Sequence, residues 1–461
     1  MSIENDFALI SDFDKNYCLQ VFAPLPVAFT KGKGSYLYDT EGNKYLDMIG
    51  GIAVNSLGHG NPKLVGAITK QAKNLIHCSN YYYIPQRSEL AYRLCRASFA
   101  DKAFFCNSGA EANEAALKLA RGYFHYKGEN KYEIITAEKS FHGRTFGSMT
   151  ATGQEKFSKP FAPVVPGFKY VPYNDLDAMK LAVGPHTAAI MLELIQGESG
   201  VNPADADYIQ AVRKLCTEKG ILLIIDEVQT GVGRTGKMFC YQNYGITPDI
   251  MTLAKGLGGG VPIGAMLCTD EAAKGFQVGD HGSTFGGNPL ACAAGIAVME
   301  YFGEANVLDN VNLVSAALFE KLNKLKSKYS CITKVRGMGL LIGIEFDESV
   351  IASGLKEELF RNGFLVSSIG KSVIRIAPPL VITKSQALSF VRTLDQLLST
   401  RMGGKPNPIL NAFKNIGRKE TPAMKALAEQ KPAEESKPAE ESKPTEESKP
   451  AALPEPEEEL E

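Results

Sequence analysis

The sequence contains little that would mark a membrane, secreted or nucleic-acid-binding protein. Its 461 residues carry a formal net charge of −1 at pH 7, so no excess of positive charge attracts nucleic acid. No apolar run approaches the roughly 18 residues that a membrane span needs. The N-terminus, MSIENDFALISDFD, is acidic and lacks the basic-then-apolar pattern of a signal peptide. We therefore expect a cytoplasmic protein that binds no nucleic acid and no membrane.

Cysteine and histidine are present without a pattern. The nine cysteines occur singly, without a Cys-x-x-Cys motif, and the six histidines show no metal-ligand spacing. An odd and scattered set of cysteines favours a reducing compartment over a disulfide framework. We therefore predict no structural disulfides and no metal site.

The remaining composition is that of an ordinary globular enzyme, with 44% apolar and 22% charged residues. The charge is divided unevenly. Residues 431–461 contain four Lys and eleven Glu, a charge of −7, so the preceding 430 residues carry +6. That moderate positive charge suits anionic small molecules. The repeats KPAEES, KPAEES and KPTEES over 431–448 have almost no large apolar residues, which predicts a disordered tail.

The middle of the chain has the pattern of an α/β domain. Between about residues 55 and 299, short apolar runs alternate with stretches of helical periodicity. This alternation predicts a mostly parallel sheet with helices on both faces. The strands are expected at 103–106, 133–136, 188–192, 221–225, 250–254 and 263–267, and the helices include 111–123 and 205–219.

The two ends of the chain differ from the middle. Before residue 55, strand-like pieces and turns include a predicted hairpin over 34–48. After residue 300, a long helix over 305–328, strand-like stretches and a helix over 384–399 predict a smaller α/β domain. The expected organisation is an N-terminal segment that packs with the small domain (1–54), a large domain (55–299), a small C-terminal domain (300–401) and the tail (402–461).

The stretch DIMTLAKGLGGG, residues 249–260, carries a candidate nucleophile. An apolar strand ends at Lys255, and the glycines that follow leave space in front of the amine. Burial disfavours the ammonium form, so such a lysine can act as a nucleophile near neutral pH and form a Schiff base with an aldehyde. The alternative is a surface lysine before a flexible loop.

Two further strand ends carry candidate cofactor-binding groups. Ser108 follows a strand and opens a helix, so the free backbone N–H groups of Gly109 and Ala110 can bind a phosphate. Asp226 ends the apolar strand ILLIID, where a carboxylate can keep a pyridine nitrogen protonated. The alternatives are a plain helix N-cap and an aspartate that caps the next turn.

Arg144 and Arg375 are arginines in glycine-rich or apolar surroundings, where a guanidinium usually pairs with a carboxylate. They are candidates for binding a substrate carboxylate, and the alternative for each is a structural ion pair.

Residues 231–237, GVGRTGK, match both G-x-G-x-x-G and G-x-x-x-x-G-K, so a nucleotide-binding protein is the competing hypothesis. We discount it because Met238 stands where the Ser or Thr for magnesium would be. The following sequence is also rich in aromatic and turn residues, so the required helix N-terminus is missing.

Together these features resemble the class-III (ornithine-type) aminotransferases, which are pyridoxal 5′-phosphate (PLP) enzymes of fold type I. The resemblance covers about residues 20–400, and Asp226 and Lys255 are 29 apart, as in the family. It is greatest for the acetylornithine aminotransferases, from the stretches FAPLPVAFTKGKGSYLYD, GGIAVNSLGHGNP, HCSNYYYIP and FCNSGAEANEA. Enzymes that use free ornithine typically have Trp at the position of His142. The motifs are FCNSGAEANEAALKLAR, FHGRT, QGE, LLIIDEVQTGVGRTGK, AKGLGGG, HGSTFGGNPL and VIRIAPPL.

The resemblance implies a fold, an assembly and a reaction. The large domain would hold a mostly parallel seven-stranded sheet between helices, beside a smaller C-terminal α/β domain, and the enzyme would be a homodimer with shared active sites. It would transfer the δ-amino group of N-acetylornithine to 2-oxoglutarate and release glutamate. Succinylornithine, N-succinyldiaminopimelate, ornithine and 4-aminobutyrate are the alternative amines.

The resemblance also implies a role for each matching residue. Lys255 would bind PLP covalently and move the substrate proton, and Asp226 would pair with the pyridine nitrogen. Arg144 and Ser283 would contact the substrate, while Thr284 would reach the phosphate of the other subunit. The PLP-binding set is Ser108, Gly109, Ala110, Phe141, Asp226, Val228, Gln229, Lys255 and Thr284.

Glu198 and Arg375 would form a switch between the two substrates. Their pair would mask Arg375 for acetylornithine and release it for glutamate. One departure from the family is that Glu193 is followed by Leu194, where Glu-Pro is common. Because Glu198 is intact, we expect a small local change without loss of activity.

Overall fold

The computed structural model describes residues 6–402, so the predicted tail lies outside them, apart from its first residue. The large sheet has seven strands in the order β4-β12-β11-β10-β7-β5-β6. Neighbours from β11 to β6 run parallel, and β12 is antiparallel to both β11 and β4. The predicted mostly parallel seven-stranded sheet is thus confirmed. Its strands are β4 (Lys102–Cys106), β5 (Glu133–Ala137), β6 (Phe168–Val171), β7 (Thr187–Glu193), β10 (Leu222–Asp226), β11 (Ile250–Leu253) and β12 (Gly264–Cys268).

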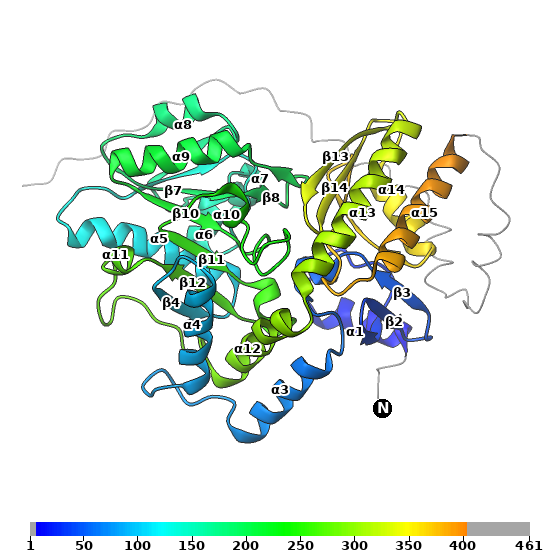
Figure 1. The fold of residues 1–461 in the computed structure, drawn as a ribbon, viewed down its shortest axis with the longest axis horizontal. Helices are drawn as coiled ribbons and strands as arrows, with labels where there is room; N and C mark the ends of the chain where they lie inside the picture. The colour runs from blue at the N-terminus through cyan, green and yellow to red at the C-terminus, as the bar shows by residue number, and fades with distance from the viewer. Residues whose placement is uncertain (1–5, 403–461) are drawn as a thin grey trace, which may run out of the picture.

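The central strands are apolar throughout because helices cover both faces of the sheet (Figure 1). Side chains alternate between the faces of a strand. In β7, Ile190 and Leu192 therefore join the core cluster that contains α9 (Ala206–Lys219), whereas Ala189 and Met191 join the cluster that contains α5 (Gly109–Tyr126). Burial on both faces explains why these strands read as unbroken apolar runs in the sequence.

The predicted helix over 305–328 begins two residues later, as α13 (Val307–Lys328). A separate helix, α12 (Pro289–Glu304), precedes it. Asn306 lies between the two with a φ of 48°, in the left-handed region, which interrupts the helical backbone. The change of direction carries the chain from the large sheet to the smaller one.

The smaller half of the molecule contains a second sheet. Its strands β13 (Ile332–Met338), β14 (Leu341–Phe346), β17 (Val373–Ile376) and β16 (Ser367–Ile369) are all antiparallel to their neighbours. Helices α13, α14 (Ala352–Arg361) and α15 (Lys384–Arg401) lie with this sheet (Figure 1).

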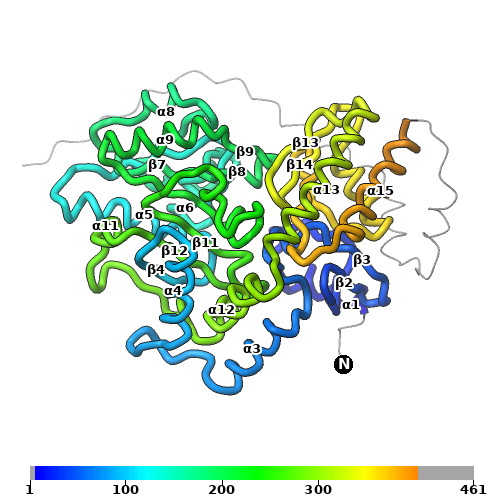
Figure 2. Tube along the Cα trace, in the orientation of Figure 1, coloured from blue at the N-terminus to red at the C-terminus, as the bar shows by residue number. Residues whose placement is uncertain are grey.

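The N-terminal part of the chain lies beside this smaller half, as the blue and yellow-to-orange segments of Figure 2 show. Strands β2 (Tyr36–Asp39) and β3 (Lys44–Asp47) form the predicted antiparallel hairpin. Strand β3 then pairs in parallel with β15 (Phe364–Leu365), so residues about 320 apart in sequence share one sheet. The predicted domain boundaries stay a prediction, although this pairing supports grouping the N-terminal segment with the small domain.

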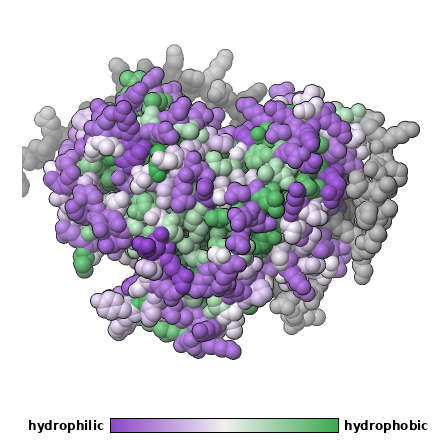
Figure 3. All heavy atoms as spheres, in the orientation of Figure 1, coloured by the Kyte–Doolittle hydropathy of each residue, from purple (hydrophilic) through white to green (hydrophobic). Residues whose placement is uncertain are grey.

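The surface is polar over the outer parts of both halves, on the face seen in Figure 3. Hydrophobic side chains on that face gather at its centre, where the two halves meet. Within residues 6–402, no helix combines the length and apolar character needed to cross a membrane.

Candidate active site

A cavity of about 440 Å³ lies at the carboxyl ends of the large sheet's parallel strands. Segments that follow β4, β5, β7, β10 and β11 all line it, because the ends of parallel strands meet at one edge of a sheet. The structure thereby brings together ten of the predicted site residues. They are Ser108, Gly109, Ala110, Phe141, Arg144, Glu198, Asp226, Val228, Gln229 and Lys255.

Lys255 follows β11 and lines the cavity. Its φ of 44° is in the left-handed region, which is strained for a residue with a side chain and is often found at functional sites. Burial lowers the pKa of Lys255 below its ordinary value, and the charge of Glu198 partly opposes this shift. The structure therefore holds an amine that is more easily deprotonated than a surface lysine.

Ser108 is the N-cap of α5, and its Oγ accepts a hydrogen bond from Glu111 N at 3.2 Å. The N–H groups of the first turn cannot be paired within the helix, so they are available to an anion. A Cβ at Gly109 would come within 2.6 Å of the Val228 side chain, so only glycine fits at this position beside the open N–H groups.

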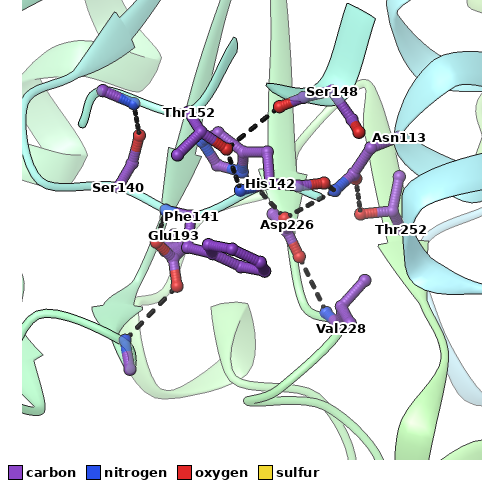
Figure 4. A network of polar contacts seen from close by, with 12 residues as sticks. Asn113, Ser140, Phe141, His142, Ser148, Thr152, Glu193, Asp226, Val228 and Thr252 are labelled. Atoms are coloured by element: carbon purple, nitrogen blue, oxygen red, sulfur yellow. Dashed lines mark hydrogen bonds and ion pairs between the residues drawn. The ribbon is translucent and has the colours of Figure 1, made fainter. Parts of the chain in front are cut away.

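Asp226 is 4% exposed and is held by three donors (Figure 4). Its Oδ1 accepts from Val228 N at 2.9 Å, and its Oδ2 accepts from Asn113 Nδ2 and His142 Nδ1, both at 2.8 Å. Because a carboxylate can only accept, His142 Nδ1 must carry the proton. An ionised carboxylate accepts roughly four hydrogen bonds, so about one position is left for a ligand.

Sequence reasoning missed Asn113 and His142 as parts of this site. Asn113 also accepts from Thr252 Oγ1 at 2.7 Å and donates to the His142 carbonyl at 2.6 Å. The sequence signal that could have identified Asn113 is a polar residue on the helix face that is buried. In the structure, Asn113 is 1% exposed on α5. A buried amide of this kind requires partners, and here they include the Asp226 carboxylate.

Glu198 and Arg375 form an ion pair between the two halves of the molecule, with 2.6 Å between Oε1 and Nη1. Gln229 Nε2 donates to the same Oε1 at 3.1 Å, and Arg375 Nε donates to Ser367 Oγ at 3.1 Å. Burial pushes the pKa of Glu198 upward. The positive charge of Arg375 and the hydrogen bonds outweigh that effect, so the pKa lies below its usual value.

Arg144 is exposed at the rim of the cavity, with its guanidinium 3.9 Å from the Phe157 ring centroid and 5.5 Å from that of Phe141. Stacking on aromatic rings orients a guanidinium without using its hydrogen bonds. Arg144 can therefore still bind a carboxylate.

Ser283 and Thr284 lie outside the set of residues that line the cavity. Ser283 Oγ accepts from Asn107 Nδ2 at 3.3 Å, so it is one residue removed from the cavity wall. Thr284 is exposed on the surface of this subunit.

The cavity has features that suit PLP. The open helix N-terminus beside Gly109 suits a phosphate, and the remaining acceptor position of Asp226 suits a protonated ring nitrogen. Gln229 Oε1 is buried without a hydrogen-bond partner among the described residues, so it can accept from a ligand. Lys255 supplies the amine that an aldehyde requires.

The glycine-rich turn over 231–237 does not have the surroundings of a phosphate-binding loop. It is followed by turns rather than a helix, and the next helix is only the four-residue α10 (Tyr241–Tyr244). Arg234 is fully buried and donates to the carbonyls of Leu340 and Pro378 at 3.1 and 2.6 Å. The turn thus joins the two halves of the molecule.

Comparisons with known proteins identify the family. The profile described as aminotransferase class-III matches residues 20–398. The acetylornithine aminotransferase of Caldanaerobacter subterraneus subsp. tengcongensis is 50% identical over 388 residues, which cover 84% of this chain and 98% of that protein.

Solved structures are similar as well. Acetylornithine aminotransferase from Elizabethkingia anophelis has a TM-score of 0.78 at 35% identity, covering 86% of this chain and 99% of that one. Ornithine aminotransferase from Toxoplasma gondii, in a structure with partial occupancy of PLP at its active site, has a TM-score of 0.83 at 31% identity, covering 87% and 96%. The chain belongs to the class-III aminotransferases and is a PLP-dependent transaminase.

Proposed function

We propose that this enzyme transfers the δ-amino group of N-acetylornithine to 2-oxoglutarate. The products are N-acetylglutamate 5-semialdehyde and glutamate, as a step of arginine biosynthesis. The observation that carries the proposal is 46–50% identity to acetylornithine aminotransferases over 83–85% of this chain in four of its relatives.

The residues around the cavity would hold PLP in a fixed orientation. When bound, PLP supplies the carbonyl that takes up the amino group and a ring that accepts electron density. Ser108, Gly109 and Ala110 would hold its phosphate, and Asp226 would keep its ring nitrogen protonated. Phe141 would stack on the ring, with Val228 and Gln229 beside it.

Lys255 would move the proton. Its Nζ takes the proton from the substrate carbon that carries the amino group, and the second half of the reaction reverses this transfer. A base must be neutral to accept a proton, and the lowered pKa of Lys255 supports this role near neutral pH.

Two substrates must use one site. Acetylornithine presents a δ-amino group on a methylene chain, whereas glutamate presents an α-amino group next to a carboxylate. Arg144 would bind the distal carboxylate of either substrate. Glu198 would mask Arg375 for acetylornithine and release it for the α-carboxylate of glutamate, and their 2.6 Å contact supports this switch.

Single-turnover kinetics of each half-reaction test the switch. Glu198→Ala should improve the glutamate half relative to the acetylornithine half. Arg375→Ala should impair mainly the glutamate half, and Arg144→Ala should impair both. Equal slowing of both halves by Glu198→Ala would show that Glu198 is only a structural partner.

The substrate itself is tested with a panel of amines. The purified enzyme should have its highest kcat/KM with N-acetylornithine when compared with succinylornithine, N-succinyldiaminopimelate, ornithine and 4-aminobutyrate. A higher value for any of the other four would replace the proposed substrate while leaving the transaminase chemistry in place.

A homodimer with shared active sites accounts for the position of Thr284. Asn80 Nδ2 donates to the carbonyls of Ser283 and Gly286, so the segments around residues 80 and 284 form one surface. Tyr81 and Phe285 on this surface are 93% and 60% exposed, which suits burial against a second copy. Light scattering should give the mass of a dimer, and a monomer with full activity would refute this assembly.

We also propose that the enzyme works in the cytoplasm. All nine cysteines are free thiols in the structure, and six of them are buried. Thiol counting on protein purified without reductant should find nine thiols after unfolding.

A further inference from the structure

Glu193 is a buried acid that the mechanism above does not use. It is the last residue of β7, it lines the cavity, and it is 6% exposed. Burying a carboxylate costs free energy, so a buried carboxylate requires hydrogen-bond partners that offset this cost. Burial raises the pKa of Glu193 to about 7, although two backbone N–H groups oppose the shift.

The two oxygens of Glu193 bind two separate parts of the active site. Oε1 accepts from Phe141 N at 2.9 Å, and Oε2 accepts from Gly197 N at 3.3 Å. Figure 4 shows the carboxylate beside Phe141, between the segment after β5 and the loop that follows β7. One side chain therefore links the residue proposed to stack on PLP with the turn that carries Glu198.

The peptide at Gly197 extends this link to the switch. Its carbonyl accepts from Arg375 Nη1 at 3.0 Å, so the N–H of Gly197 is bound by Glu193 and its carbonyl is bound by Arg375. The turn also lies directly against Gln229, because a Cβ at Gly197 would come within 1.8 Å of Gln229 Oε1.

We propose that Glu193 is a positioning residue that fixes the Phe141 ring and the Gly197–Glu198 turn relative to each other. It thereby sets the position of the ring that is proposed to stack on PLP. It also sets the position of the Glu198–Arg375 pair. This inference rests on the proposed function, because it concerns residues assigned there to PLP and to the second carboxylate.

The chain offers a matched control in Glu227. This residue is 1% exposed, and its carboxylate accepts from Cys240 N and Tyr241 N, both at 2.7 Å. Its pKa is raised by burial to about 8, so the two acids are alike in their burial and in accepting two backbone hydrogen bonds. Glu227, however, is not among the residues that line the cavity.

The experiment compares Glu193→Gln with Glu227→Gln in the protein freed of cofactor. A glutamine has one acceptor oxygen, so each variant loses one of two backbone hydrogen bonds. Hydrogen exchange should rise over residues 139–144 or 195–199 in E193Q, and only around 240 in E227Q. The dissociation constant for PLP should rise about tenfold in E193Q, as the loss of one such bond predicts. It should change less than about twofold in E227Q.

The half-reactions give a second readout that a purely structural acid would not change. E193Q should alter the rate ratio of the glutamate and acetylornithine halves, whereas E227Q should preserve it. If E193Q does not fold, Glu193→Asp replaces it, because the shorter acid keeps its charge but cannot reach both N–H groups.

Equal PLP affinity and equal exchange near 141 and 197 in wild type and the Glu193 variant would overturn the proposal. So would a Glu193 variant that matches E227Q in every measurement. Exchange and PLP affinity need no amine substrate, so these arms decide about Glu193 even if acetylornithine is not the preferred donor. The amine panel decides that question separately.

Discussion

Two glycine-rich turns of this enzyme look alike in sequence and differ in function. The turn over 255–260 begins with Lys255 and lines the cavity, while the turn over 231–237 carries Arg234 and joins the two halves of the molecule. In the first turn, Lys255 and Gly260 line the cavity, while a Cβ at Gly258 or Gly259 would come within 2.9 Å of Ile263 or Leu64. In the second turn, a Cβ at Gly233 would come within 2.2 Å of the Phe302 ring. In both turns the missing side chains leave room for other parts of the protein.

The comparison shows that a glycine pattern indicates close packing around the backbone. It does not say whether the turn faces a ligand or another part of the protein. The second turn matches two nucleotide-binding patterns, yet its cation is fully buried against backbone carbonyls. The elements that flank each turn decide whether it lines the cavity or joins the two halves. A strand end at the ligand edge of the sheet precedes Lys255, and small-domain segments pack against Arg234.

The largest effect should come from Lys255→Ala. Removing the amine removes both the covalent partner of PLP and the base, so kcat should fall by about 10³-fold or more. The denaturation midpoint of the apoenzyme should change little. Lys255→Arg is the control that keeps the positive charge without a useful base. Ordinary turnover by the alanine variant would remove Lys255 from the mechanism.

Arg234→Ala should act on stability. It leaves the Leu340 and Pro378 carbonyls without a donor and opens a cavity between the halves, which should cost about 3 kcal/mol of unfolding free energy. Urea denaturation of the apoenzyme measures this loss, and Arg234→Lys should recover part of it. If alanine at this position left the midpoint unchanged, the turn would not join the halves.

Glu227, which precedes the second turn and accepts from Cys240 N and Tyr241 N beyond it, should make stability pH-dependent. Burial raises its pKa from 4.5 to about 8, so between these values the folded state keeps a proton that the unfolded state has released. Stability from this group is therefore present below pH 4.5 and is lost as pH rises to about 8. The stability advantage of wild type over Glu227→Gln should decline over that range. A constant difference would contradict it.

The smallest effect concerns the titration of Lys255 in the apoenzyme. Because burial lowers its pKa, Lys255 should react with an amine reagent at a lower pH than ordinary lysines do. The rate should be followed against pH by mass spectrometry of the modified peptide, with exposed Lys214 as an internal reference. Equal profiles would mean that Lys255 is solvated like a surface lysine.

Sequence patterns predicted Lys255 and Asp226 because each stands at the end of an apolar strand, and strand ends meet at the ligand edge of such a sheet. The same rule could have identified Glu193, an acid at the end of the equally apolar β7. Asn113 and His142 were harder to predict. Their partner Asp226 lies 113 and 84 residues away. The packing of α5 against the sheet brings Asn113 to it, and the segment after β5 brings His142.

The fold was predictable where periodicity is strong and less so elsewhere. Strand β6, with the partly exposed pattern FKYV at the sheet's edge, was missing from the predicted strands. The break at Asn306 was missed because a left-handed asparagine leaves the apolar periodicity of the flanking helices undisturbed.

The pairing of β3 with β15 has a consequence for synthesis of the chain. Leu46 pairs with Phe364, so β3 leaves the ribosome 318 residues before its neighbour exists. At 5–20 residues per second, this is a wait of roughly 15–60 seconds. During that time the open edge of β3 is a template for pairing with other chains. A nascent chain therefore has to keep this edge from pairing with a wrong strand until residue 365 has been made.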